Sequence, residues 1–134
     1  ATPAYLACHG VPVHPRDLEV HQAVIYNRAG GGETWPLRRG DELYNTSVGG
    51  RLRVSAAEGV RAAVKANLGL TMASEWMFAP ELASGEVMTV LEDWTLPSID
   101  LWAVFPAGRM TSAKARVFVD YVAALLNNEP RDGI

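Results

Sequence analysis

Two serines, Ser55 and Ser74, are the residues best placed to contact a small ligand, because each precedes a predicted helix that follows a predicted strand. Ser55-Ala56-Ala57-Glu58 has the spacing S-x-x-E of a capping box. A helix start presents unpaired N–H donors and a partial positive charge, so it favours anions. In open α/β sheets, ligands bind beyond the carboxyl ends of the strands, where such helix starts lie. The pattern indicates ligand capture, although each serine could also do no more than cap its helix.

Other arrangements that could carry chemistry are absent from the sequence. Cys8, His9, His14 and His21 lack the close pair spacings of a zinc site. There is no G-x-S-x-G motif, and the glycines at 30–32 lack the G-K-[ST] ending of a phosphate loop. We therefore expect no catalytic residue, no metal and no cofactor, and we do not expect an enzyme.

Composition limits the partners of these 134 residues. Apolar residues make up 49% and the net charge is −3, which is ordinary for a globular domain and unlike a nucleic-acid-binding module. One cysteine favours a reduced compartment, and no apolar run reaches the ~20 residues of a membrane helix. A signal peptide pattern is also missing, so the sequence predicts a cytoplasmic protein without membrane contact.

The patterning predicts an α/β fold with a mixed, mainly parallel sheet flanked by helices. Trp76 and Trp102 are expected to pack in the core. The final helix, capped by Thr111 or Ser112, has an apolar face that includes Phe118 and Leu125. In chain order we expect two short helices in 1–22, strands at 23–26 and 35–37, and a hairpin of 41–47 and 51–55 around Gly49-Gly50. A helix at 56–68, closed by Gly69, and a strand at 70–73 should follow. A helix split at Pro80 and ended by Gly85 comes next, and then strands at 87–91 and 101–105.

The order of these pieces resembles the effector-binding domain of LysR-type transcriptional regulators. The phrases that carry the resemblance cover nearly the whole chain and are ATPAYLACHG, HPRDLEVHQAVIYNR, VGGRLRVSAAEGVRAAVKANLGLTMASEWMFAPELASGEVMTVLEDW and IDLWAVFPAGRMTSAKARVFVDYVAALL. This sequence departs from the family pattern at Ser55-Ala56, where Asn-Asp is common, and at Ser74, where proline is usual.

The resemblance implies a two-lobed sensor similar to periplasmic binding proteins. Residues 1–91 would form the second lobe, and 92–134 would be the return segment to the first lobe, with a strand at 101–105 that lacks its sheet neighbours here and a C-terminal helix. The DNA-binding winged helix-turn-helix would lie outside this chain. A small effector, anionic by default, would bind between the lobes and alter the geometry of a dimer or tetramer on DNA.

The resemblance also assigns roles to individual residues. The expected effector contacts are Asn27, Arg28, Gly31, Ser55, Ala56, Ser74 and Glu75. The helix at 56–68 resembles the one used in the family's antiparallel sensor dimer, and its expected interface residues are Ala57, Arg61, Ala62, Val64 and Lys65. Two alternatives stay open from the residues themselves, namely a stand-alone solute-binding lobe and a small α/β hydrolase that uses Ser55, Ser74 and Glu75.

Overall fold

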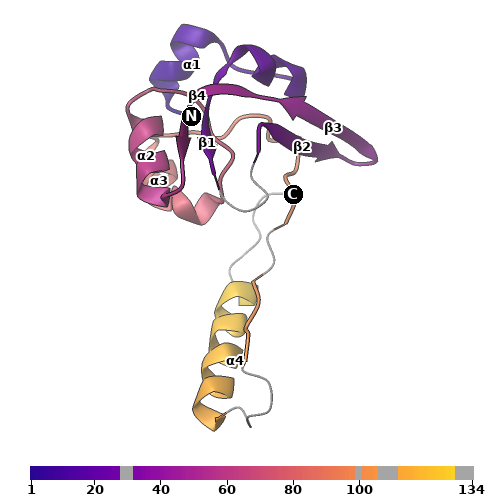
Figure 1. The fold of residues 1–134 in the computed structure, drawn as a ribbon, viewed down its shortest axis with the longest axis vertical. Helices are drawn as coiled ribbons and strands as arrows, with labels where there is room; N and C mark the ends of the chain where they lie inside the picture. Colours follow the sequence, from indigo (N-terminus) through magenta and orange to yellow (C-terminus); the bar gives the residue numbers. More distant parts are fainter. Residues whose placement is uncertain (28–31, 99–100, 106–111, 129–134) are drawn as a thin grey trace. The chain divides into compact units, whose positions relative to one another are not determined.

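The computed structural model describes residues 1–27, 32–98, 101–105 and 112–128, which belong to two units, 1–97 and 98–134. The second unit contains the helix α4 (Ala113–Asn128). Among the residues just given, all the strands and the other helices belong to the first unit (Figure 1). Its elements in order are α1 (Pro3–His9), the 3₁₀ helix η1 (Pro15–Val20), β1 (Gln22–Tyr26), β2 (Thr34–Arg39), β3 (Glu42–Ser47), β4 (Gly49–Val54), α2 (Ala57–Lys65), the 3₁₀ helix η2 (Glu75–Met77) and α3 (Ala79–Ser84).

A parallel sheet is centred on β1. On one side β1 pairs with β4 in parallel, with Tyr26 opposite Val54. On its other side Ala23 forms a parallel bridge with Leu70, whose N–H donates to the carbonyl oxygen of Gln22 at 3.0 Å. The predicted α/β class is confirmed, while the expected strand at 70–73 is reduced to this single bridge.

The antiparallel hairpin lies earlier in the chain than predicted. It joins β2 to β3 through Gly40, which has a φ of +58°, so the hairpin expected around Gly49-Gly50 is wrong. Those two glycines begin β4 instead. A Cβ atom on Gly50 would lie 1.9 Å from the carbonyl oxygen of Ala23, so this glycine permits close approach of β4 to β1 rather than a turn.

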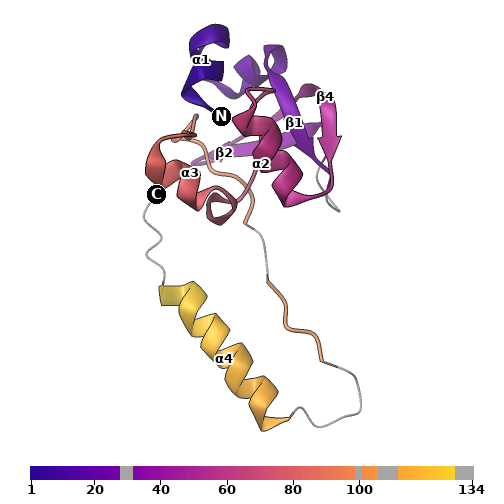
Figure 2. The same ribbon diagram turned by 90° about the vertical axis from the view of Figure 1, so that its left-hand side faces the viewer.

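Neighbouring residues of β1 face two separate hydrophobic clusters, because side chains alternate along a strand. Val24 packs with Val60 and Val64 of α2, and Figure 2 shows α2 lying beside β1 and β4. Ile25 packs on the other face, in a cluster that includes Tyr5 and Trp35. Helices therefore pack on one face of β1, and the N-terminal segment and the β2–β3 hairpin pack on the other.

Helix α2 begins and ends differently from the prediction. Its N-cap is Ala56, which makes no side-chain cap bond, so the capping box predicted for Ser55 and Glu58 is wrong. The helix ends at Lys65, and Asn67 takes the left-handed conformation with a φ of +61°. Gly69 also has positive φ and passes close to the carbonyl oxygen of Gln22, so it serves the approach to β1 rather than the helix cap.

The segment after Leu70 contains two short helices separated near Pro80, as the sequence predicts. Pro80 stands in the first turn of α3, where its missing N–H costs no hydrogen bond, and Gly85 ends α3 with a φ of +75°. Trp76 is 73% exposed, so its expected place in the core is wrong. The strand expected at 87–91 is also wrong, since these residues form no strand.

In the second unit, α4 begins as expected after Ser112, whose hydroxyl accepts from the N–H of Ala115 at 3.2 Å. Its predicted apolar face is largely exposed, and residues 101–105 form no strand. Trp102 is 77% exposed, which contradicts its expected packing in a core. An apolar strand needs a neighbouring sheet to be buried, and the described residues of this unit supply none.

A buried histidine joins α1 to the start of β1 and makes stability depend on pH. The hydroxyl of Tyr5 accepts from the N–H of Gln22 at 2.9 Å and lies 3.2 Å from Nδ1 of His21. Burial lowers the pKa of His21 below its ordinary 6.5; the charge of His9 lowers this pKa too, and Asp17 opposes the shift.

The unfolded chain therefore binds more protons than the folded chain just below pH 6.5. We expect the stabilisation from neutral His21 to be complete above 6.5 and lost as the pH falls from there towards the folded pKa. Urea unfolding on both sides of this pH measures the effect. His21→Gln should flatten the slope in this window, and an unchanged slope in this variant would contradict the assignment.

Candidate functional site

The candidate binding edge lies where the carboxyl ends of the parallel strands meet. Asn27 follows β1, and its N–H donates to the carbonyl oxygen of Val54 at 2.8 Å, so Ser55 follows the neighbouring strand at the same edge. Ser74 follows the bridging segment on the other side of β1, which Thr71 ties down by donating to the carbonyl oxygen of Val24 at 2.9 Å. The three predicted contact segments thus follow three neighbouring stretches of one sheet, whereas Arg28 and Gly31 lie outside the described residues.

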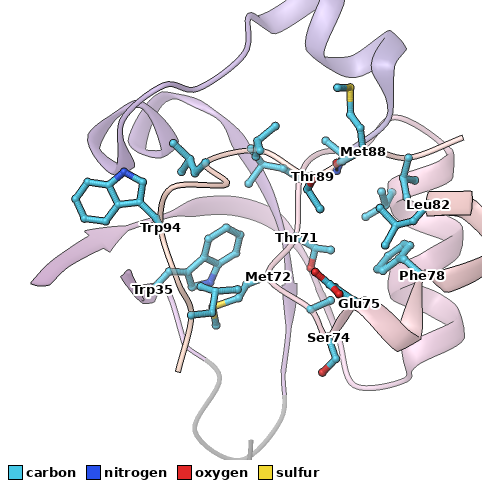
Figure 3. Close-up of a pocket in the computed structure, with 18 of the residues that line it drawn as sticks. Trp35, Thr71, Met72, Ser74, Glu75, Phe78, Leu82, Met88, Thr89 and Trp94 are labelled. Carbon is cyan, nitrogen blue, oxygen red and sulfur yellow. Dashed lines mark hydrogen bonds between the residues drawn. The ribbon is translucent and has the colours of Figure 1, made fainter. Parts of the chain in front are cut away.

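A cavity of about 160 Å³ opens beside this edge, between the segment after Leu70, α3 and residues 87–91 (Figure 3). Among the predicted contact residues Ser74 and Glu75 line it, and Asn27, Ser55 and Ala56 do not. Its lining residues are Ala1, Leu18, Trp35, Leu37, Val64, Leu70, Thr71, Met72, Ala73, Ser74, Glu75, Phe78, Leu82, Val87, Met88, Thr89, Val90, Leu91, Trp94 and Leu96.

Two tryptophans of this cavity have no assigned role from sequence. Trp35 and Trp94 are both buried, and Arg39 lies over the Trp94 ring at 4.5 Å from its centroid. His14 meets the same ring edge-on at 5.5 Å between centroids. The sequence signal was weak, because neither tryptophan lies in a regular apolar pattern and tertiary packing alone brings them together.

The start of α2 presents backbone donors without a side-chain cap. Ala56 occupies the N-cap, and Glu58 stands in the first turn. Since the first N–H groups of a helix have no intrahelical acceptor, this end can accept an anionic group. The predicted contact at Ser74 and Glu75 differs from the start of α2. The helix that follows Ser74, η2, has only three residues and provides no comparable helix dipole.

Replacing Ala56 by serine should stabilise α2. Serine at an N-cap accepts from an early helix N–H, and the gain over alanine is typically about 1 kcal/mol. We expect Ala56→Ser to raise the free energy of unfolding by about this amount in urea titrations followed by circular dichroism. Ser55→Ala is the matched control and should change the free energy of unfolding little, because Ser55 does not occupy the cap. A large loss in Ser55→Ala with no gain in Ala56→Ser would instead support the capping box predicted from sequence.

Ion pairs tie the exposed side of α2 to α3 and to the residues just after it. Arg61 pairs with Glu81, and Nζ of Lys65 lies 3.2 Å from a carboxylate oxygen of Glu86. The hydrogen bond from Arg61 is the main reason that the pKa of Glu81 lies below its ordinary value. Val64 is 1% exposed and packs against β1, so its predicted place in a dimer interface is wrong, whereas Ala62 and Lys65 are exposed.

The described part of the chain contains no group of three or more His, Cys, Asp or Glu side chains that could hold a metal ion. A search of the same residues for helices long and apolar enough to cross a membrane finds none.

The sheet and its flanking helices define a class of protein, the periplasmic-binding-protein-like α/β domains found in bacterial regulators. The regulatory domain of AphB from Vibrio vulnificus superposes with a TM-score of 0.72 at 28% identity, covering 93% of this chain and 62% of that one. The full-length virulence activator AphB of Vibrio cholerae superposes with a TM-score of 0.77 at 29% identity, covering 93% of this chain and 43% of that one.

The model of the LysR substrate binding domain matches residues 1–127, and the chain belongs to this family. An HTH-type transcriptional regulator of Xanthomonas campestris pv. campestris is 31% identical over 131 residues, which are 95% of this chain and 38% of the relative. The regulator DmlR of Escherichia coli is 31% identical over 123 residues, 91% of this chain and 40% of that protein. The chain thus spans about two fifths of the length of these relatives, whose names are those of regulators rather than enzymes.

Proposed function

We propose that this chain is the ligand-sensing lobe of a LysR-type transcriptional regulator, which binds a small effector between two lobes and does not catalyse a reaction. The observation that carries the proposal is the family match together with the convergence of Asn27, Ser55 and Ser74 at one sheet edge. The names of the relatives favour a regulator over the two alternatives, a stand-alone solute-binding lobe and a small hydrolase.

The effector contacts that we propose on this lobe are the segment after β1 and the starts of the two following helices. An anionic group would meet the uncapped start of α2, next to Ser55 and Ala56. The residues in this proposal are Asn27, Arg28, Gly31, Ser55, Ala56, Ser74 and Glu75. Residues 1–91 would be the second lobe, and residues 92–134 would return to the first.

The proposed mechanism is a population shift. An effector that contacts both lobes stabilises the closed arrangement, and it can shift the equilibrium by no more than its difference in affinity for the two states. The closed form would change the geometry of a dimer or tetramer on DNA. We propose that a winged helix-turn-helix outside these residues contacts the DNA, and that the protein acts in the cytoplasm.

The test uses the complete protein encoded by the gene that contains these residues. Its melting temperature and its retention of genomic DNA fragments are measured across a panel of small carboxylates. We expect at least one carboxylate to raise the melting temperature and change the bound DNA. If the protein retained DNA but responded to no carboxylate, the proposal of an anionic effector would be wrong. If it failed to retain DNA, the proposal that it is a transcriptional regulator would be wrong.

A charge at the α2 start separates capping from ligand binding. Ala56→Asp should keep or raise the stability of the lobe, because aspartate is a good N-cap, while its negative charge repels an anionic effector. We expect the affinity for a responding carboxylate to fall at least about tenfold, on the scale of a lost charged contact. Ala56→Asn, which caps without charge, is the control and should retain more of the affinity; equal losses would contradict a charge effect.

We also propose that the exposed side of α2 contacts a second copy of the protein. Ala57 and Ala62 are small and permit close helix approach, while Arg61 and Lys65 are partly held by Glu81 and Glu86. Ala62→Glu should lower the dimer fraction in sedimentation experiments on the complete protein, since it places bulk and charge at the contact. Ala66→Glu, on the same exposed helix end, tests the extent of the face, and an unchanged dimer in both variants would exclude α2.

A further inference from the structure

We propose that Glu81 of α3 is a positioning residue for the contact between two copies of the protein. Its buried carboxylate holds and neutralises Arg61 and Lys65, the two cations on the face of α2 that would meet the second copy. The inference rests on the proposed function, because it concerns the same face of α2, and it adds a residue that lies on a different helix.

The burial of Glu81 is unusual for a carboxylate. Its residue is 3% exposed, and it is the only acidic residue among those that are buried in the described part of the chain. Glutamate is almost never fully buried unless it is paired. The next residue, Leu82, packs against the cluster that Phe78 forms with Val60 and Val64 of α2. The carboxylate therefore lies where α3 packs against α2.

Two cations of α2 surround this carboxylate. Arg61 donates a hydrogen bond to Oε1 of Glu81, and Nζ of Lys65 lies 3.8 Å from the same oxygen. Residues four apart are neighbours on a helix surface, so these two like charges repel each other. Glu81 offsets this repulsion, and Glu86 adds a second negative charge at 3.2 Å from Nζ of Lys65. The charges of these four groups sum to zero.

Both cations still reach the surface at which a second copy would bind. The side chain of Arg61 is 37% exposed and that of Lys65 is 40% exposed. Glu58, the other charged residue of α2, stands in the first turn, where the helix end is itself positive. A two-fold contact brings the same patch of both copies together, so uncompensated positive charge on one patch would meet the same charge on the other. Neutralisation by Glu81 removes this repulsion.

The ion pair has a donor and an acceptor that are not yet used. Nε of Arg61 and Oε2 of Glu81 are both buried, and neither has a hydrogen-bond partner among the described residues. These two atoms are the ones that a second, parallel bond between the same side chains would join. A pair with two bonds fixes the plane of the guanidinium as well as its charge. Glu81 is therefore suited to orient Arg61 in addition to neutralising it.

Glu81 also stands on the segment that carries two proposed effector contacts, Ser74 and Glu75. The N–H of Phe78 donates to the carbonyl oxygen of Glu75 at 2.8 Å, and the N–H of Leu82 donates to the carbonyl oxygen of Phe78 at 2.8 Å. Backbone hydrogen bonds thus run from this contact segment into α3. The carboxylate that holds the cations of α2 and the proposed effector contacts share one hydrogen-bonded segment.

The test measures the self-association of the complete protein by sedimentation equilibrium, at low salt and at high salt. Glu81→Gln keeps the size of the side chain and removes its charge. We expect this variant to raise the Kd of the dimer at least about fivefold at low salt, because like charges then face each other. High salt should restore most of the lost affinity, since it screens charges near the surface. A purely structural defect would not recover in salt.

Further variants separate charge from damage. Combining Glu81→Gln with Lys65→Gln restores the balance of charge and should recover most of the lost affinity. Glu86→Gln is the matched control. It removes a carboxylate whose side chain is 48% exposed, so the Kd should change by about twofold or less, as for other exposed ion pairs. If the melting temperature shows that Glu81→Gln does not fold, Arg61→Gln breaks the same pair from its partly exposed end and should give the same salt-reversible loss.

An unchanged Kd in a folded Glu81→Gln or Arg61→Gln protein would overturn the inference. A loss that neither high salt nor Lys65→Gln reverses would also overturn it, and equal effects of Glu81→Gln and Glu86→Gln would show that burial gives Glu81 no special role. If the unchanged protein did not self-associate at all, the contact at α2 would itself be wrong, which is a failure of the proposed function. The retention of DNA and the response to carboxylates are measured separately from all of these outcomes.

Discussion

Gly50→Ala should lower the free energy of unfolding by about 3 kcal/mol, at the upper end of the usual cost of overpacking. An added Cβ would lie 1.9 Å from the carbonyl oxygen and 2.8 Å from the carbonyl carbon of Ala23. Both atoms belong to the backbone of the sheet, so no side-chain rotation can relieve the clash, and β4 would have to move away from β1. Urea unfolding followed by far-ultraviolet circular dichroism measures the loss.

Gly49→Ala is the matched control, since a Cβ at this neighbouring glycine meets nothing within 4 Å. We expect its effect to stay within about 0.5 kcal/mol, as for other exposed substitutions. The pair also discriminates between a strand and the turn predicted from sequence. A Gly-Gly hairpin turn needs positive φ at both positions, so comparable losses in both variants would support the turn and contradict the start of β4.

The second large effect is expected from Ile25→Ala, at about 3 kcal/mol, because the substitution leaves a cavity that the sheet cannot close. Ile25 is 1% exposed and belongs to the same hydrophobic cluster as Tyr5 and Trp35, which lie on different elements. The same unfolding experiment measures the change. Val20→Ala, at a residue that is 85% exposed, is the control and should be nearly neutral. A small effect at Ile25 would mean that β1 is not the central strand.

Several local features could be predicted from sequence because short-range chemistry fixes them. Pro80 lies where the helical segment after Ser74 is split, and Gly85 ends α3 with positive φ. The apolar run of β1 also forms the expected strand. In each case one residue type restricts its own backbone, or a run of apolar side chains demands burial, whatever surrounds it.

The errors arose where local chemistry permits two outcomes. Gly49-Gly50 suits a tight turn as well as a close strand approach, and only the pairing of β4 with β1 selects the second. Ser55 and Ala56 are both possible helix caps, and the end of β4 decides between them. The exposure of Trp76 and Trp102 could not be predicted because an indole suits a core and a surface pattern equally well without knowledge of its neighbours.

The candidate site divides in the same way. The sequence alone indicated the family and the places of Ser55 and Ser74 after predicted strands. Tertiary structure alone brought Trp35, Trp94 and Glu75 to the lining of one cavity, because these residues come from separate parts of the chain. Periodicity indicates whether a side chain lies on the buried or the exposed face of its helix or strand. It contains no information about which distant side chain will lie opposite.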